Sequence, residues 1–416
     1  MRRAEDETVR RLRALHAARL GSGACGGAAD GAEPVVLASA PGRVELAGNH
    51  TDHQGGRTLS ASIDRRAWAL AVPNGTDELR VVMDGFGEAV VRVGEWEPRA
   101  DERGTSQALV RGMAAAYARS GGDVRGCDVA TCSEVPVGSG LSSSAAFEVL
   151  IGAVLRGLDG AKEGATLDPM ALAIDSVEAE RIYFGKPCGM QDQLASAHGG
   201  AVALDFASEP PRVTPVAFDA AASGYALCLV DCRCDHSRYA DEYAAVPADM
   251  FAVARHFGRD RLEDVSPDAF LGQLAAVRAQ VGDRAALRAL HYFDETRRVR
   301  AQQAALEAGD FATFLEGVRQ SGASSAQVLQ NVSPHADGTG AEQPAMVVLA
   351  LCTHLLDADG AGAYRIHGGG FGGSVLAIVA DDAAPAFMAS MNRLLGYDAC
   401  MTVGIDARGA FVERLA

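Results

Sequence analysis

Apolar residues recur along the chain with two different periods, which predict where strands and helices lie. Alternation of apolar and polar residues is typical of strands, whereas apolar residues at i, i+3, i+4 and i+7 are typical of helices. The first pattern predicts strands over residues 35–48, 58–73, 78–85, 89–96 and 127–140, the last running into a glycine-rich turn. The second predicts helices over residues 106–120, 141–158 and 169–185.

The chain begins with a different pattern. Residues 1–20 predict an amphipathic surface helix, because Leu12 and Leu15 recur with other apolar residues at helical spacing. Residues 21–34 are small and polar, as in flexible linkers.

The second half of the chain favours long helices. A strand over residues 226–232 leads into helical stretches that reach about residue 330, and residues 363–382 predict a strand, a glycine loop and a strand. A chain of 416 residues is too long for one ordinary core. We therefore expect an α+β chain with two domains and a leading segment: residues 1–34, 35–205 and 206–416.

Composition and charge narrow the class of protein. A net charge of -16 argues against nucleic acids and anionic membranes as partners, because these attract basic surfaces. No apolar run approaches the roughly 20 residues that span a bilayer, and no secretory signal is visible. Nine cysteines without paired spacing fit a reducing compartment, so we expect a cytoplasmic protein. Cys228, Cys232 and Cys234 with His236 could suggest zinc, but the second half of a ligand set is missing.

Residues 42–56, GRVELAGNHTDHQGG, form a polar segment without helical or strand periodicity. Glycines let the backbone turn sharply, and five side chains along the segment carry hydrogen-bonding or charged groups. These five are Arg43, Asn49, His50, Asp52 and His53.

A second motif, PVGSGLSSSAA at residues 136–146, lies where a strand ends and a helix begins. The free N–H groups at a helix start and the helix dipole favour anions, so the motif predicts a phosphate site. The alternative is a helix capped by serine after a flexible turn. The motif is not a Walker A loop, because the Gly185–Lys186 pair is followed by proline, and no Rossmann fingerprint opens the chain.

Two further clusters combine glycines with polar residues. GGGFGG, residues 368–373, could be a hairpin turn, but five glycines favour a backbone that closes over a ligand. Glu180 ends a predicted helix, and Asp192 lies in a loop after it. Both could be solvated carboxylates, yet Cys188–Gly189–Met190 beside Asp192 is a poor environment for an unpartnered charge.

Taken in order, these motifs resemble those of the GHMP small-molecule kinases, and within them the branch that acts on galactose. GRVELAGNHTDHQGG is similar to the sugar motif, PVGSGLSSSAA to the ATP loop, CGMQDQ to the catalytic loop and RIHGGGFGGS to the third motif. ADEY and HYFDETRRV add weaker similarity, and the resemblance covers about residues 35–380. It implies a two-domain GHMP fold, with an N-terminal ribosomal-protein-S5-like domain and a C-terminal α/β-plait-like domain.

The resemblance also implies roles for matching residues. Arg43 corresponds to the arginine that stabilises the transferred phosphoryl group, and Asp192 to the residue that activates the sugar hydroxyl. Ser144 and Glu180 correspond to the Mg²⁺ ligands. The ATP loop consists of Gly138, Ser139, Gly140, Leu141, Ser142, Ser143 and Ser144. The sugar-contacting positions are Asn49, His50, Thr51, Asp52 and Tyr243.

The implied reaction is phosphorylation of the C1 hydroxyl of D-galactose by ATP with Mg²⁺. Two departures fall in the sugar motif, since the family usually has glutamate at the position of Asn49 and tyrosine at that of His53. A kinase for another hexose, such as N-acetylgalactosamine, is therefore one alternative. A non-catalytic galactose sensor is another, although Ala145 and Ala146, which that branch lacks, are present. A structural ATP-binding module would leave the sugar motif unexplained.

Two questions stay open at the level of sequence. Arg43 nearby should lower the pKa of Asp192 and weaken it as a base, so Asp192 could either abstract the proton or orient the hydroxyl. The oligomeric state is not encoded in any motif, and a monomer is compatible with the sequence.

Overall fold

Two β-sheets organise the chain in a computed structural model, which describes residues 2–21, 35–160, 167–186, 188–234, 239–333, 340–356 and 362–415. Residues 22–34 of the expected linker and His236 of the cysteine group lie outside the described residues. The first sheet has eight strands in the order β12-β1-β2-β5-β3-β4, with β6 pairing β2 and β7 pairing β6. Its strands are β1 (Val35–Ala47), β2 (Arg57–Pro73), β3 (Glu78–Met83), β4 (Gly87–Arg92), β5 (Cys127–Ser133), β6 (Ala201–Asp205), β7 (Arg212–Val216) and β12 (Phe411–Leu415).

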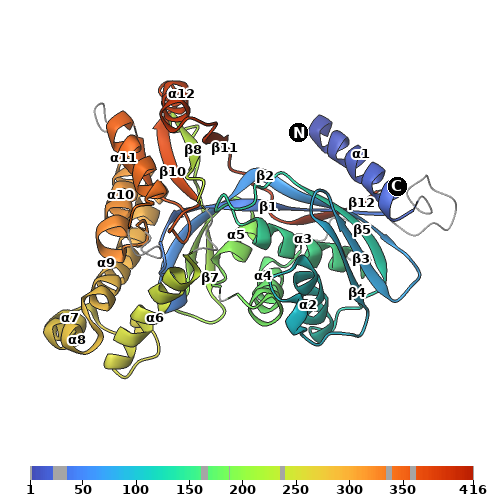
Figure 1. The fold of residues 1–416 in the computed structure, drawn as a ribbon, viewed down its shortest axis with the longest axis horizontal. Coiled ribbons are helices and arrows are strands. Elements are labelled where there is room, and N and C mark those ends of the chain that lie inside the picture. The colour runs from blue at the N-terminus through green and yellow to red at the C-terminus, as the bar shows by residue number, and fades with distance from the viewer. Residues whose placement is uncertain are drawn as a thin grey trace.

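Both faces of the first sheet are covered by helices (Figure 1). Leu37 and Leu70 pack with Leu12 of α1 (Arg2–Arg19), the amphipathic helix expected at the start of the chain. Their strand neighbours Val36 and Ala69 belong to the core on the opposite face, because successive side chains of a strand point to opposite sides. That second face is covered by α2 (Ser106–Arg119), α3 (Ser143–Leu158), α4 (Pro169–Glu178) and α5 (Gln191–His198).

The helix predicted over residues 169–185 is α4 followed by a π-helical turn, η3 (Ala179–Phe184). The segment ends at Gly185, whose φ of +89° suits a residue without a Cβ. Asp192 was expected in a loop, but it lies in the first turn of α5. A carboxylate is favoured there because the partial positive charge of a helix N-terminus stabilises it.

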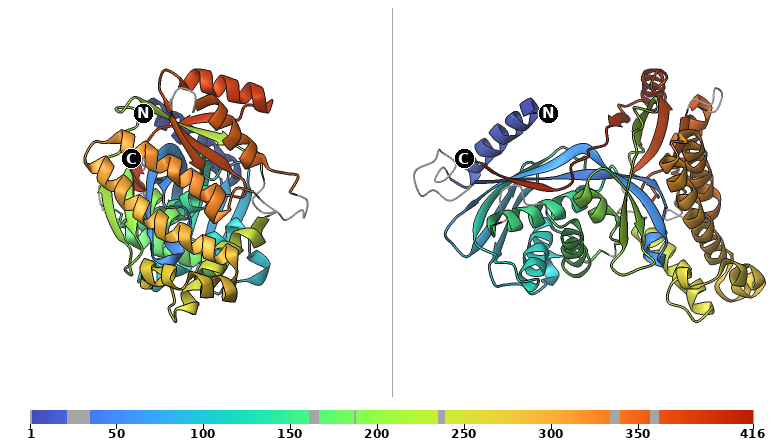
Figure 2. Two further views of the ribbon diagram at one scale, coloured as in Figure 1. Left: turned by 90° about the vertical axis from the view of Figure 1, so that its left-hand side faces the viewer. Right: turned by 180° about the vertical axis from the view of Figure 1, so that it is seen from behind.

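The second sheet is antiparallel, in the order β11-β8-β10-β9. Its strands are β8 (Tyr225–Asp231), β9 (Gly362–Ile366), β10 (Ser374–Ala380) and β11 (Cys400–Val403). The helices of this half are α6 (Ala240–His256), α7 (Pro267–Gly272), α8 (Leu274–Val281), α9 (Asp283–Glu307), α10 (Phe311–Ser324), α11 (Pro344–Leu356) and α12 (Ala384–Leu395). Short turns are η1 (Asp52–Gln54), η2 (Ala100–Glu102), η5 (Leu262–Asp264) and the π-helical η6 (Ser325–Leu329). The long orange helices pack along the second sheet and also reach β1 and β2 of the first sheet (Figure 2).

Strand pairing crosses the boundary expected after residue 205. β7 pairs with β6, and β12 returns from the end of the chain to pair with β1, so both join the first sheet. The largest apolar core likewise contains Val299, Phe314 and Leu376 beside residues of β1 and β2. The division into residues 35–205 and 206–416 therefore stays a prediction.

Whether a helix can cross a membrane depends on its length and on its hydropathy. Within the described ranges, none is both long enough and apolar enough to cross a membrane.

The contact between α1 and the sheet can be tested through Leu12, which is fully buried. Leu12→Ala is expected to lower the free energy of unfolding by about 2–5 kcal/mol, because it removes buried methyl groups and leaves a cavity. Urea denaturation measures this loss, with Glu7→Ala on the exposed side of α1 as the control. Equal stability of the two variants would show that α1 does not depend on Leu12 for its contact.

Candidate active site

Arg43 of β1 and Asp192 of α5 form an ion pair, although 149 positions separate them in sequence. The Arg43 Nε donates to the Asp192 Oδ1 at 2.8 Å, and its Nη1 donates to the carbonyl oxygen of Gly140 at 2.5 Å. Arg43 is 5% exposed, whereas the Asp192 side chain is 38% exposed, so the arginine lies inside the protein and the carboxylate opens to the surface. The structure thus brings the predicted arginine and aspartate together against the predicted ATP loop.

The environment of Asp192 keeps its carboxylate ionised. Burial alone would raise the pKa of Asp192, but the charge and hydrogen bond of Arg43 and a hydrogen bond from Ser142 hold it below its usual value. The Ser142 hydroxyl donates to Asp192 Oδ2 at 2.5 Å. This contact was not predicted, because the sequence placed Ser142 only in the ATP loop.

The loop of residues 138–144 is held in a strained shape by its neighbours. Gly138, Gly140 and Ser142 adopt left-handed φ values of 77°, 77° and 58°. The carbonyl oxygens of Ser139, Gly140 and Leu141 accept hydrogen bonds from the Ser374 hydroxyl, the Arg43 guanidinium and the Arg43 backbone, respectively. Ser143 and Ser144 follow in the first turn of α3, where backbone N–H groups lack partners within the helix. A loop that hydrogen bonds hold in place before a helix N-terminus is the geometry that binds phosphate.

Glu180 is 2% exposed and therefore is not a solvated surface carboxylate. Its Oε1 accepts from Lys186 at 3.0 Å and its Oε2 from the Gln193 amide at 2.9 Å. The same Gln193 amide contacts Glu148 Oε2 at 3.2 Å. Within the described part of the chain, no group of three or more His, Cys, Asp or Glu side chains is placed to hold a metal ion. A cation near Glu180 would therefore need hydroxyl or phosphate oxygens as well.

Two predicted sugar-contacting residues lie side by side. His50 has a φ of 57° and its ring is 5.3 Å from that of Tyr243 in the first turn of α6. The His50 Nε2 is 2.8 Å from the carbonyl oxygen of Gly369, which fixes the tautomer that donates from Nε2. Burial lowers the pKa of His50 to about 3, and that of His53 to about 4, so both rings are neutral near pH 7.

Asp52 packs directly over the backbone of Gly189 in the loop before α5. A Cβ added to Gly189 would lie 1.7 Å from the Asp52 Oδ2, so glycine is the residue that leaves room for this carboxylate. Burial raises the pKa of Asp52 to about 6, and the negative charge of Asp192 acts in the same direction. Asp52 thus lies within electrostatic reach of the ion pair.

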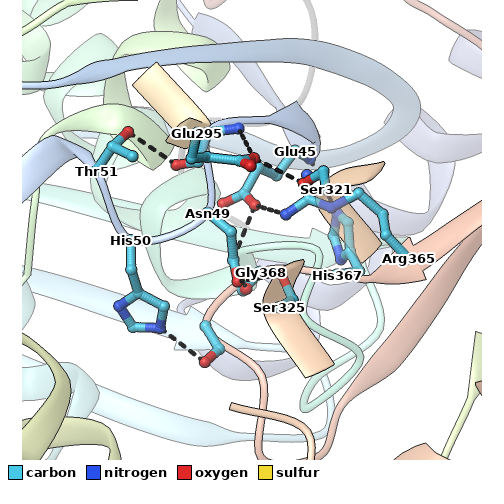
Figure 3. Close-up of polar contacts among 12 residues, drawn as sticks. Glu45, Asn49, His50, Thr51, Glu295, Ser321, Ser325, Arg365, His367 and Gly368 are labelled. Carbon is cyan, nitrogen blue, oxygen red and sulfur yellow. Dashed lines mark hydrogen bonds and ion pairs between the residues drawn. The ribbon is translucent and has the colours of Figure 1, made fainter. Parts of the chain in front are cut away.

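Asn49 and Thr51 point into the protein (Figure 3). Both are fully buried, and the Thr51 hydroxyl contacts the carbonyl oxygens of Gly48 and Arg57. The Asn49 amide nitrogen donates to Glu45 Oε1 at 3.1 Å and to Gly368 O at 2.5 Å. Its oxygen accepts from Asn331 and Ser325. The structure therefore engages the Asn49 amide with protein groups, and a sugar contact at either position stays a prediction.

Glu45 is a buried carboxylate that no motif in the sequence indicates. Arg365 of β9 donates to Glu45 Oε1 at 2.6 Å, and Gln191, adjacent to Asp192, donates to Oε2 at 3.0 Å. Glu45 follows Arg43 by two residues, so the strand period places both side chains on one face. The strand period is therefore the sequence signal that could have pointed to Glu45. Its partners Arg365 and Gln191 come from distant segments of the chain, so they leave no local pattern.

The glycine loop of residues 368–373 joins β9 to β10, an antiparallel pair, so it is a hairpin connection. It also contacts the sugar motif, through the carbonyl oxygens of Gly368 and Gly369. A Cβ at Gly369 would lie 2.2 Å from the Tyr243 ring, and one at Gly370 would lie 2.1 Å from Asn331 O. The loop therefore needs glycine to approach the residues around His50 closely.

Comparison with known proteins gives two family matches. Residues 108–200 match the GHMP kinases N terminal domain, and residues 28–73 match the galactokinase galactose-binding signature. A galactokinase of Streptomyces coelicolor is 34% identical over 356 residues, which cover 84% of this chain and 86% of the relative. A galactokinase of Mycobacterium bovis is 33% identical over 390 residues, covering 89% and 95%.

Solved structures give the same fold. The galactokinase of Lactococcus lactis complexed with galactose matches with a TM-score of 0.77 and 23% identity, over 98% of this chain and 100% of that one. The mevalonate kinase of L. major in complex with R-mevalonate matches with a TM-score of 0.59 and 17% identity, over 89% and 96%. At these identities the likeness establishes the fold alone.

The two-sheet fold, with a glycine–serine loop before α3 and an arginine–aspartate pair against it, defines a GHMP small-molecule kinase. The α+β GHMP fold expected from the sequence is thereby confirmed. With relatives above 30% identity over most of its length, the chain belongs to the galactokinase family, and it is a phosphotransferase.

The packing of Asp52 over Gly189 can be tested with Gly189→Ala. The added methyl group would displace the carboxylate, and displacements of about 1 Å can cost on the order of a hundredfold in rate. We expect kcat/KM for the sugar substrate to fall at least about tenfold. Gly272→Ala is the control, because a Cβ there meets open space. An unchanged kcat/KM for Gly189→Ala would mean that Asp52 is not held by this contact.

The Glu45–Arg365 pair can be tested with Glu45→Gln. Arg365 is fully buried and its Nε and Nη1 have no hydrogen-bond partner, so the loss of the Glu45 charge leaves a buried cation uncompensated. Breaking such a pair typically costs about 3–5 kcal/mol in the free energy of unfolding. Urea denaturation should show this loss, whereas Asp64→Asn, in an exposed pair with Arg65, should cost less than about 1 kcal/mol. Similar losses in both variants would contradict a structural role for Glu45.

Proposed function

We propose that the chain phosphorylates D-galactose at its anomeric C1 hydroxyl, with ATP and Mg²⁺ as the phosphoryl-donor system. The observation that carries the proposal is the ion pair between the buried Arg43 and Asp192, which contacts the ATP loop through Gly140 and Ser142. Catalysis of phosphoryl transfer depends mainly on positioning the reactants and on neutralising charge. This pair supplies both beside the sugar motif.

ATP would bind with its phosphates on the loop of residues 138–144 and the N-terminus of α3. The residues proposed for Mg²⁺ fit that ion, because Ser144 and Glu180 offer the oxygen ligands that Mg²⁺ prefers. Glu180 is buried, and Glu148 Oε1 nearby has no hydrogen-bond partner, which leaves an oxygen available for a cation. Bound Mg²⁺ would neutralise charge on the triphosphate.

Asp192 would orient the C1 hydroxyl rather than act as a strong base. Its pKa lies below the usual value because Arg43 and Ser142 stabilise the carboxylate, and a weaker base gains less by taking a proton. A carboxylate can still accept a hydrogen bond from the hydroxyl and align it for attack. Arg43, whose Nε and Nη1 hold Asp192 and Gly140, would face the transferred phosphoryl group with the rest of its guanidinium.

Sugar recognition would rest on Asp52, His50 and Tyr243. Asp52 is half-buried and accepts hydrogen bonds from hydroxyls when ionised, while His50 and Tyr243 present neighbouring rings. Asn49 and Thr51 would hold the shape of the sugar motif from the protein interior, because their polar atoms bond to protein groups. This arrangement preserves galactose recognition without a glutamate at position 49.

The proposal is tested by measuring ADP release from Mg-ATP across a panel of free hexoses, with the phosphorylated position identified by NMR. Galactose should give the highest kcat/KM and a product phosphorylated at C1. Higher kcat/KM with N-acetylgalactosamine or glucose would overturn the choice of sugar. No turnover with any hexose, together with saturable galactose binding, would favour a sensor.

Asp192→Asn should stay folded. The amide oxygen can still accept from Arg43 Nε, and the Ser142 hydroxyl can turn to accept from the new amide N–H. We expect turnover to fall by at least about two orders of magnitude, the loss that misalignment of a reacting group can cause. Steady-state kinetics measure this loss, with Asp64→Asn on the surface as the control. A folded Asp192→Asn enzyme with near-normal turnover would remove Asp192 from the mechanism.

The pH dependence should report Asp52, whose pKa is raised to about 6 by burial. The ionised form accepts sugar hydroxyls, so kcat/KM for galactose should fall as the pH drops through about 6. Asp192 has a lowered pKa and stays ionised in this range, so kcat should be less sensitive than kcat/KM. In Asp52→Asn the acid limb should disappear from the remaining activity. An unchanged limb in that variant would assign it to another group.

A further inference from the structure

Glu148 is a fully buried carboxylate on α3 whose charge has no cationic partner among the contacts of the described residues. Its Oε2 accepts from the Gln193 amide at 3.2 Å, while its Oε1 has no hydrogen-bond partner. The Gln193 Oε1 is buried and unpartnered as well. Two buried oxygens thus remain without hydrogen-bond partners in one place, which is costly unless something with positive charge or donor hydrogens meets them.

The surroundings of Glu148 are rich in negative charge. Gln193 donates to Glu180 as well as to Glu148, so two buried carboxylates share one amide. Across the described ranges, Lys186 is the cation in contact with this pair, and it binds Glu180. One ammonium therefore faces two carboxyl groups, and its contact is with Glu180 rather than with Glu148.

Other buried carboxylates of this protein have a charged partner. Glu102 is paired with Arg111 at 2.6 Å, and Asp175 with Arg156 at 2.6 Å. Glu148 lies instead four residues after Ser144, so both side chains fall on the same face of α3. That face carries the proposed Mg²⁺ ligand from the ATP loop.

We propose that Glu148 is a further cation-binding residue of this kinase, acting with Ser144 and Glu180, and that the Gln193 oxygen supports the same site. This inference rests on the Mg²⁺ site of the proposed function and extends it to a residue that the sequence motifs did not indicate. Oxygen ligands from carboxylate, hydroxyl and amide groups suit a hard divalent cation. The divalent cation supplies the positive charge that Glu148 otherwise lacks.

The test is direct binding of Mn²⁺, followed by the electron paramagnetic resonance signal of the free ion, in the presence of ADP and without turnover. Glu148→Gln keeps the shape but removes the charge, and it should weaken Mn²⁺ binding at least about tenfold, as should Glu180→Gln. Asp128→Asn, which neutralises a buried carboxylate elsewhere whose partner Arg80 is partly exposed, should bind Mn²⁺ as the wild type does.

Thermal unfolding gives a second readout. Without metal, Glu148→Gln should melt at or above the wild-type temperature, because it removes an uncompensated buried charge. Added Mn²⁺ should then raise its melting temperature less than that of the wild type. If Glu148→Gln does not fold, Glu148→Asp replaces it and should weaken Mn²⁺ binding severalfold, because the carboxylate is one methylene shorter.

The outcomes separate this inference from the proposed function. Wild-type Mn²⁺ affinity in Glu148→Gln, or in Glu148→Asp where that variant is used, together with weaker binding in Glu180→Gln, would overturn the role of Glu148 alone. If the wild type shows no saturable Mn²⁺ binding with ADP, the cation site itself fails and the inference fails with it.

Discussion

The ion pair between the buried Arg43 and the partly exposed Asp192 is the interaction on which the site depends. It joins β1 to the first turn of α5 and, through Gly140 and Ser142, to the loop before α3. Burial of an unpaired arginine would be costly, so the pair also constrains how β1, α5 and the ATP loop fit together. One contact therefore fixes the geometry of three motifs that lie far apart in sequence.

A second buried pair extends this constraint to the other sheet. Glu45 follows Arg43 on β1 and binds Arg365 of β9 as well as Gln191 beside Asp192. Because Glu45 also contacts Asn49, the strand that carries Arg43 supports the sugar motif from inside the protein. The glycine loop completes the arrangement through its carbonyl oxygens at residues 368 and 369. The sugar motif is thus shaped by polar contacts between segments of both sheets.

Much of the fold follows from local patterns in the sequence. The strands of the first sheet and the helices on it have clear periods of two and 3.6 residues. Leu37 and Leu70 lie on the sheet face beneath α1, where they pack with Leu12. The start of α5 escaped prediction because glycine and proline nearby suggested a loop that continued past Asp192. The return of β12 to pair with β1 also left no local signal, since strand pairing is a long-range property.

Part of the candidate site could likewise be predicted from the sequence, and part could not. The proximity of Arg43, Asp192 and the loop of residues 138–144 could be predicted from the residue types and the order of the motifs, while their roles stay predictions. The inward orientation of Asn49 and Thr51 could not, because it depends on partners such as Asn331 that only the folded chain brings near. The same holds for Glu45 and Glu148, whose importance lies in burial and in the charges around them, neither of which shows in sequence.

The most direct measurement is a double-mutant cycle on turnover of Mg-ATP and galactose, with Arg43→Ala, Asp192→Asn and the double variant. The central claim is that Arg43 and Asp192 act as one unit. The account predicts strongly non-additive losses, so that the double variant turns over about as slowly as the slower single variant. A double variant whose loss equals the product of the two single losses would contradict the claim, because the two residues would then act independently.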